Sequence, residues 1–213
     1  MKNPVFTTVL LVGLAIAALV GYLRTDDAWL TRDMFVSAAE ASPGIGPASG
    51  TPFPALEAVH GDRTVASLEE FTRGNGVVVI ALRSVDWCRY CRKQLVELQA
   101  RRHIFDAHNV GLVAVTYDAP AAQQAFIDEF GITIPVLSDE SSALFHALDI
   151  LNHEVEPGSP QYGIPHPGLI VVSPAQEIVG ALFVDRPEKR VEAEEVLVYS
   201  REVLGLASPF NPG

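Results

Sequence analysis

Short apolar runs rich in β-branched residues alternate along the chain with stretches of helical periodicity. The runs at residues 77–82 (VVVIAL) and 110–116 (VGLVAVT) are nearly continuous, which is typical of strands covered on both faces of a parallel sheet. Between them, apolar positions recur at spacings of three and four from residue 88 to about residue 108, which predicts an amphipathic helix. Strand, helix and strand together predict a right-handed βαβ unit.

The second half of the chain predicts smaller elements. A helix over 121–130 is expected to end at Gly131, followed by a short strand over 132–137 and a short helix over 141–148. The runs at 169–173 and 177–184 flank Pro-Ala-Gln and predict a hairpin with an antiparallel edge. Pro187 is expected to open a final helix that covers one sheet face. The pattern therefore predicts an α/β domain built on a mixed sheet.

The amino-terminal region contains an uncharged apolar stretch from Val5 to Leu23. As a helix it would be about 28 Å long, which matches a bilayer core. We expect an uncleaved signal anchor, with a short tail in the cytoplasm and the rest of the chain on the extracytoplasmic side, the periplasm in a bacterium. A cleaved signal peptide and a buried core helix are the alternatives.

The expected organisation follows from this stretch and from the segment after it. Residues 1–25 form the transmembrane anchor, and 26–50 form a juxtamembrane segment of mild helical periodicity followed by a linker rich in Pro, Gly and Ser. Residues 51–206 form the globular domain, and 207–213 form a carboxy-terminal tail.

Composition and charge exclude several classes of protein. With 48% apolar residues in 213, the chain can build a core and is not a disordered protein. A net charge of −11 repels phosphate backbones, which excludes nucleic acid as a partner. Two cysteines cannot form a disulfide scaffold or a four-thiolate zinc site, and the histidines show no ligand spacing, so no metal is expected.

The two cysteines form a Cys-x-x-Cys pair, Cys88 and Cys91, at the start of the first predicted helix. At the helix amino terminus, partial positive charge is expected to lower the pKa of Cys88 and make it the attacking thiolate. Cys91 lies one turn further on and is expected to stay protonated until it resolves a mixed disulfide on Cys88. The dithiol itself is the redox centre, so no dissociable cofactor is expected.

The segment from Leu82 to Leu95, LRSVDWCRYCRKQL, resembles the active-site segment of redoxins of the alkyl hydroperoxide reductase/thiol-specific antioxidant (AhpC/TSA) family. The segments 53–68, 113–118 and 135–139 resemble those that flank it in the family. The resemblance covers most of 51–204 and implies a thioredoxin-like α/β/α three-layer fold. It also implies a cis-proline beside the cysteines, for which Pro167 is favoured over Pro165, and it places His166 facing the disulfide.

Further residues near the pair are candidate active-site neighbours. Cations close to Cys88 favour its thiolate. An aromatic ring beside an exposed disulfide shields the thiols or contacts substrate. Thioredoxins carry a buried acid where this chain has Leu82, and Asp86 is the candidate substitute. The neighbours are Arg83, Asp86, Trp87, Arg89 and Tyr90, whereas Arg92 is expected to point to solvent.

Three functions remain open at this point. Typical peroxiredoxins carry Thr three residues and Pro seven residues before the peroxidatic cysteine, and counted from Cys88 these positions are Val85 and Ala81. The main hypothesis is therefore a membrane-anchored thiol–disulfide oxidoreductase that acts on protein or small-molecule thiols and disulfides and takes electrons from an upstream thiol donor. One alternative is an antioxidant thiol peroxidase with Cys88 as the peroxidatic residue. The other is a tethered, non-enzymatic binding domain with a structural disulfide.

Overall fold

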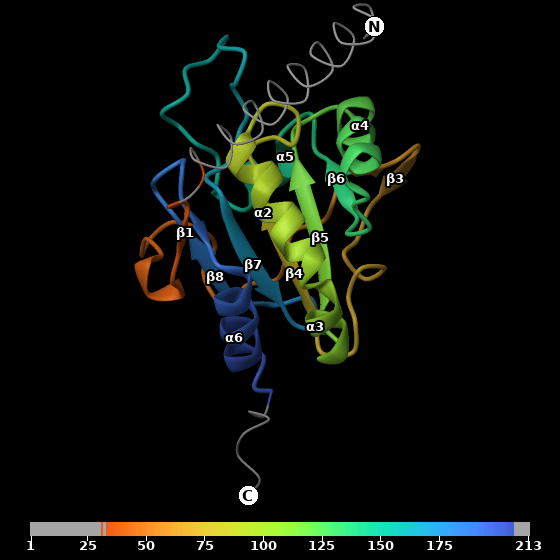
Figure 1. Ribbon diagram of the computed structural model, residues 1–213, viewed down its shortest axis with the longest axis vertical. Helices are drawn as coiled ribbons and strands as arrows, with labels where there is room; N and C mark the ends of the chain where they lie inside the picture. The colour runs from red at the N-terminus through yellow and green to blue at the C-terminus, as the bar shows by residue number, and fades with distance from the viewer. Residues whose placement is uncertain (1–30, 32, 207–213) are drawn as a thin grey trace, which may run out of the picture.

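The computed structural model describes residue 31 and residues 33–206 (Figure 1). Its main sheet has the strand order β3-β2-β6-β5-β4-β7-β8. The strands are β2 (Ala58–His60), β3 (Arg63–Val65), β4 (Val77–Ala81), β5 (Gly111–Thr116), β6 (Val136–Ser138), β7 (Gly168–Val172) and β8 (Ile178–Phe183).

The centre of this sheet follows the predicted pairing. β4 pairs in parallel with β5, and β5 pairs in parallel with β6, so the predicted βαβ unit is confirmed. β7 pairs antiparallel with both β4 and β8, which confirms the predicted hairpin and makes the sheet mixed. Every residue of β4, β5 and β7 is buried, as their continuous apolar runs indicate.

The helices cover both faces of the sheet. In Figure 1, α2 (Arg89–Ala100) and α6 (Ala193–Val203) lie in front of the sheet and α5 (Ala143–Ala147) lies behind it. The alternation of side chains along β4 divides the core in the same way. Ile80 belongs to the cluster that contains Leu95 of α2, whereas Val79 belongs to the cluster that contains Phe145 of α5. The fold is therefore a three-layer α/β/α arrangement.

Helix boundaries agree with the sequence pattern in one place and differ in another. α4 (Pro120–Phe130) ends at Gly131, whose φ of 61° is the left-handed conformation that glycine adopts readily. The helix predicted over 88–108 is instead divided into α2 and α3 (Arg102–Ala107). Arg101 separates the two with φ of −103° and ψ of 4°, outside helical geometry. The helical spacing of apolar residues continues across this break, so the pattern did not reveal it.

The final helix begins later than predicted. Pro187 does not open it, because the chain first forms β9 (Arg190–Val191), and α6 begins at Ala193. β9 pairs in parallel with β1 (Phe35–Val36) in a separate two-stranded sheet. The mild helical periodicity of 26–42 likewise gives only β1 and the short 3-10 helix η1 (Ala38–Glu40) among its described residues. Backbone pairing between two distant segments has overridden local propensity.

The segment after η1 runs along the edge of β8. The backbone N–H of Ser42 donates to the carbonyl oxygen of Phe183 at 2.8 Å, and that of Gly50 donates to Ile178 at 2.8 Å. No helix among the described residues is long and apolar enough to span a bilayer. The expected anchor over 5–23 lies outside the described residues.

Candidate functional site

The two cysteines lie where the chain leaves the central strand β4 and enters α2. Cys88 is the N-cap residue of α2, and Cys91 lies in the first turn. Both side chains are buried, with 3% of Cys88 and 0% of Cys91 exposed, and both thiols are free. The backbone N–H of Cys91 donates to Cys88 Sγ at 3.4 Å. The predicted position of the pair at a helix amino terminus is confirmed.

A buried carboxylate shapes the loop that leads to the pair. Asp118, just after β5, accepts hydrogen bonds from Ser84 Oγ at 2.8 Å and from the backbone N–H of Val85 at 2.7 Å. Ser84 Oγ in turn accepts from the backbone N–H groups of Asp86 and Trp87. The side chain of Asp86 is itself exposed. The buried acid beside this loop is therefore Asp118, and Asp86 does not take that place.

The cation that contacts the sulfurs is Arg190 of β9, which sequence reasoning missed. Its Nη2 lies 2.9 Å from Cys91 Sγ and 3.5 Å from Cys88 Sγ. Its Nη1 donates to the carbonyl oxygens of Pro187 and Lys189. Only 1% of Arg190 is exposed, and it is the largest fully buried side chain of the described residues. A buried guanidinium is thus held against both thiols.

These contacts decide which sulfur carries the negative charge. Burial by itself raises the pKa of Cys91, but a hydrogen bond from the Cys88 thiol, the charge of Arg190 and a backbone hydrogen bond from Ser84 lower it to about 5. The pKa of Cys88 is raised by its hydrogen bond to Cys91 and by burial. Together with the shorter distance from Arg190 Nη2 to Cys91 Sγ, these effects favour the thiolate on Cys91.

The predicted division of charge, with the thiolate on Cys88, differs from the one that these contacts favour. Cys88 does sit at the helix amino terminus, yet the full charge of Arg190 is nearer to Cys91 Sγ than to Cys88 Sγ. A full charge at hydrogen-bond distance outweighs the partial charge of a helix end.

The aromatic neighbours lie next to the pair as expected. Trp87 is 37% exposed, and its Nε1–H donates to Tyr117 Oη at 3.0 Å. The guanidinium carbon of Arg83 lies 5.1 Å from the centre of the Trp87 ring. Tyr90 is half-buried and packs against the core cluster that includes both cysteines. The exposed Trp87 and the half-buried Arg83 thus lie together in the segment immediately before Cys88.

The arginines of α2 are arranged as follows. Arg89 is exposed on the first turn. Arg92 forms an ion pair with Glu129 at 2.9 Å and stacks on Phe126 and Phe130, with 5.5 and 5.1 Å to the ring centres. Arg92 therefore links α2 to α4.

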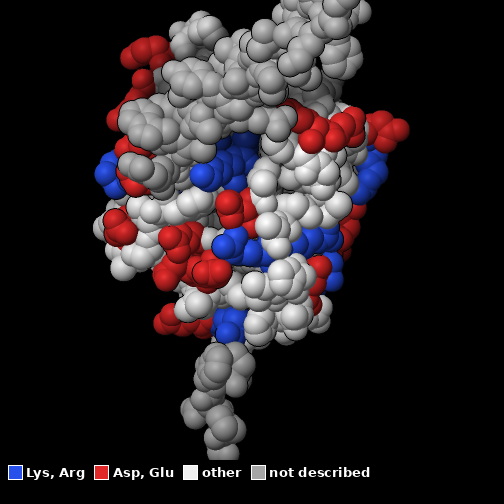
Figure 2. All heavy atoms as spheres, viewed as in Figure 1, with Lys and Arg blue, Asp and Glu red and all other residues white. Residues whose placement is uncertain are grey.

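Over the face formed by α2 and α6, Lys and Arg side chains lie among Asp and Glu side chains (Figure 2). Arg101, for example, forms ion pairs with Glu97 and Glu194.

The predicted cis-proline is not present. Every peptide bond of the described residues is trans, including the bond before Pro167. The backbone here is already paired, since His166 N–H donates to the carbonyl oxygen of Ile150 at 2.8 Å and Pro165 bridges to Leu151. It therefore does not offer a free edge to a substrate strand. His166 is half-buried, and burial lowers its pKa, but no hydrogen bond among the described residues joins it to either sulfur.

No group of three or more His, Cys, Asp and Glu side chains with metal-binding geometry occurs in the part of the chain that the structure describes.

Comparison with known proteins identifies the family. The family model described as AhpC/TSA family matches residues 49–181, and the chain belongs to that family. With its free Cys-x-x-Cys pair, it has the peroxiredoxin-like form of the thioredoxin fold found in thiol-based oxidoreductases. No curated protein matches the sequence.

Solved structures agree on the fold. Peroxidoxin BcpB from Mycobacterium tuberculosis is 14% identical, with a TM-score of 0.61 over 76% of this chain and 99% of that one. Peroxiredoxin Q from Xanthomonas campestris is 20% identical, with a TM-score of 0.61 over 73% of this chain and 98% of that one. Thiol peroxidase from Chromobacterium violaceum is 22% identical, with a TM-score of 0.58 over 74% of this chain and 90% of that one.

The lowered pKa of Cys91 predicts a thiolate that persists in acid. Thiolate absorbance near 240 nm in the reduced protein should fall with a midpoint near pH 5. In Arg190→Met the midpoint should rise by about 1 to 3 pH units, because the nearby positive charge is gone. Since an unfolded cysteine has a pKa of about 8.5, the thiolate stabilises the folded dithiol at higher pH, and this stabilisation is lost as the pH falls through the folded value.

The two single-cysteine variants assign the titration. Cys88→Ser should keep a thiolate below pH 7, because the serine hydroxyl can still donate to Cys91. Cys91→Ser should lose it. A low midpoint that survives in Cys91→Ser and disappears in Cys88→Ser would show that the charge belongs to Cys88.

Proposed function

We propose that this protein is a dithiol peroxidase whose peroxide-reducing thiolate is Cys91. The observation that carries the proposal is the buried Arg190, with Nη2 at 2.9 Å from Cys91 Sγ and at 3.5 Å from Cys88 Sγ. A guanidinium held there stabilises the attacking thiolate before the reaction and the negative charge that develops on the peroxide oxygens during it. Membership of the AhpC/TSA family supports the same reaction class.

The reaction needs only the two cysteines and an external thiol. The Cys91 thiolate attacks one oxygen of the hydroperoxide, the O–O bond breaks, and the leaving oxygen departs as an alcohol or water after taking a proton. Cys91 is then a sulfenic acid. The Cys88 sulfur attacks it, water leaves, and a Cys88–Cys91 disulfide forms. No metal or organic cofactor takes part in these steps.

The same arrangement accounts for the departure from the usual peroxiredoxin pattern. Counted from Cys88, the position of the family's threonine is Val85, which has no hydroxyl. Counted from Cys91, that position is Cys88, whose sulfur lies 3.5 Å from the same Arg190 Nη2. We infer that the Cys88 thiol takes the part of the threonine hydroxyl and later becomes the resolving thiol.

Reduction of the disulfide returns the site to its starting state. We propose that the donor thiol attacks Cys88, because 3% of that residue is exposed against 0% of Cys91. Cys91 then leaves as the thiolate that Arg190 stabilises, and a thiol of lower pKa is the better leaving group. We infer that the donor approaches over the exposed Trp87, which precedes Cys88 in the chain.

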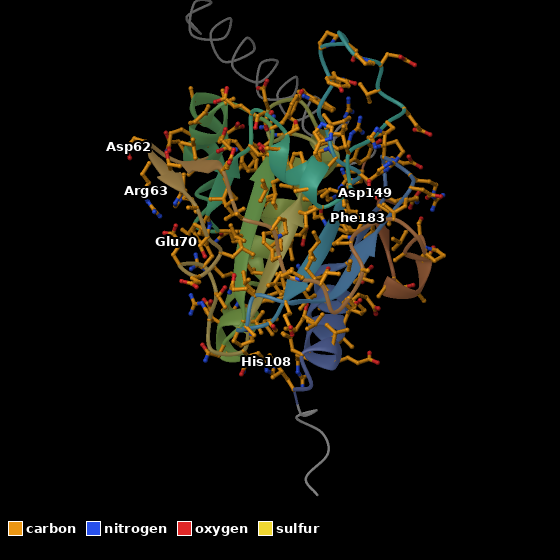
Figure 3. The ribbon with its side chains drawn as sticks, turned by 180° about the vertical axis from the view of Figure 1, so that it is seen from behind. Asp62, Arg63, Glu70, His108, Asp149 and Phe183 are labelled. Atoms are coloured by element: carbon orange, nitrogen blue, oxygen red, sulfur yellow. The ribbon has the colours of Figure 1, made fainter. Side chains whose placement is uncertain are left out.

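Steady-state peroxide consumption with a dithiol donor tests this function. Cys91→Ser should be inactive, and Arg190→Met should lower kcat/KM by about 100-fold or more, because it removes the charge that stabilises the transition state. Arg63→Met is the matched control. Arg63 lies on β3, at the edge of the sheet opposite β8, and forms an ion pair with Glu70 (Figure 3). A wild-type rate no faster than that of a free thiol would reject the proposal.

A thiol–disulfide oxidoreductase acting on proteins is the second candidate. It is favoured by the placement of Cys88, the N-cap of α2 and the more exposed sulfur, directly after the exposed Trp87. In this cycle Cys88 attacks a substrate disulfide and Cys91 displaces the product. The extracytoplasmic, membrane-anchored setting inferred from Val5 to Leu23 would suit exported substrates.

Insulin reduction separates the second candidate from the first. With a dithiol donor, turbidity should develop with the wild-type protein and be lost in Cys88→Ser, since that variant lacks the sulfur that attacks the substrate disulfide. In Cys91→Ser, Cys88 should instead accumulate a mixed disulfide with insulin, visible by mass spectrometry. Equal turbidity in Cys88→Ser and wild type would eliminate this reaction.

A further inference from the structure

The parallel pair of β1 and β9, which we call the strap, lies apart from the seven-stranded sheet and carries Arg190. The backbone N–H of Arg190 donates to the carbonyl oxygen of Met34 at 2.8 Å, and that of Glu192 donates to Val36 at 3.0 Å. The side chain of the same Arg190 contacts both sulfurs. One residue thus joins the strap to the redox centre.

The strap also contacts the helix that carries the cysteines. Lys93, two residues after Cys91 in α2, donates from Nζ to Thr31 Oγ1 at 3.1 Å and lies 6.0 Å from the centre of the Phe35 ring. Met34 is 2% exposed. The segment that pairs with β9 is therefore packed against the redox centre and its helix.

The dithiol supplies the anion that compensates the positive charge of Arg190. Within the described residues no Asp or Glu forms an ion pair with Arg190, and its other partners are the neutral carbonyl oxygens of Pro187 and Lys189. Its Nε is buried without a hydrogen-bond partner. Among the described residues, the negative charge that can balance this buried cation is that of the sulfur pair, and a buried charge that loses its partner is strongly disfavoured.

We propose that β1 positions Arg190 for the dithiol, and that closure of the Cys88–Cys91 disulfide loosens the strap. The inference rests on the proposed function only in that the pair must cycle between dithiol and disulfide. Closure joins one thiolate and one thiol into a neutral S–S bond, releases one proton and passes two electrons to the oxidant. Arg190 then keeps its charge but loses its anion, so the guanidinium moves toward water and draws β9 away from β1.

The coupling between strap and dithiol acts in both directions. If the disulfide weakens the pairing of β1 with β9, then weaker pairing of these strands must also weaken the contact between Arg190 and the thiolate. The coupling free energy is the same in both directions. The oxidation state of the cysteines is thereby transmitted to the segment that precedes the globular domain.

Hydrogen exchange by mass spectrometry tests the redox dependence on the whole protein. The disulfide is made with diamide, so that peroxide is not needed. Amides of Arg190 and Glu192, which donate to β1, should exchange about tenfold or more faster in the disulfide form, because the ion pair that holds them is lost. In Arg190→Met the two redox states should exchange alike, whereas Arg63→Met should behave as the wild type. Equal exchange in both redox states of the wild type would overturn the proposal.

A substitution immediately before β1 tests the positioning of Arg190. Met34→Ala removes a buried, uncharged side chain and leaves the backbone acceptor in place. The thiolate titration midpoint should move upward, toward that of Arg190→Met. A purely structural role for β1 would lower stability without moving the midpoint, and that result would contradict the positioning role. If Met34→Ala does not fold, the redox comparison on the wild-type chain still decides the matter.

The outcomes separate this inference from the proposed function. Redox-dependent exchange in a protein that does not reduce peroxide would reject the peroxidase and leave the strap coupling standing. Peroxide turnover with no redox dependence of exchange would reject the strap coupling and leave the peroxidase standing.

Discussion

The contact between the Arg190 guanidinium and the two sulfurs is the interaction on which the site depends. Arg190 is 1% exposed, and its Nη2 lies 2.9 Å from Cys91 Sγ. Burial of a guanidinium is costly unless an anion and hydrogen bonds compensate it. A thiolate on Cys91 supplies that anion, and the Cys88 thiol, the cation and the Ser84 backbone together lower the pKa of Cys91 to about 5. Each group compensates the buried charge of the other.

The fold brings the parts of this centre together from distant segments. The buried strand β4 ends at the loop that Asp118 fixes from the neighbouring strand β5, and that loop delivers Cys88 to the start of α2. β9 brings Arg190 from beyond the hairpin, and β1 holds β9 in place. The chemistry therefore relies on the thioredoxin-like scaffold for the cysteines and on the strap for the cation. In the coupling proposed above, a redox change at the sulfurs reaches β1 through Arg190.

Much of the scaffold could be predicted from the sequence, because it follows from local patterns. The continuous apolar runs identified β4 and β5, the hairpin of β7 and β8 followed from its turn, and the Cys-x-x-Cys spacing placed Cys88 at a helix start. Arg190 was missed because its role depends on contacts with residues about a hundred positions away, and because Pro187 suggested that it lay in a helix. The preference that Arg190 gives to a thiolate on Cys91 was missed for the same reason. Pro167 was expected to be cis from the resemblance to thioredoxins, but internal pairing at Pro165 and His166 uses that backbone.

The central claim is that Arg190 makes Cys91 the sulfur that reacts with peroxide. Its most direct test is to treat reduced Cys88→Ser and Cys91→Ser proteins with one equivalent of hydroperoxide in the presence of dimedone, which traps sulfenic acids, and to locate the adduct by mass spectrometry. The account requires a rapid adduct on Cys91 in Cys88→Ser and little on Cys88 in Cys91→Ser. A rapid adduct on Cys88 together with an unreactive Cys91 would contradict it.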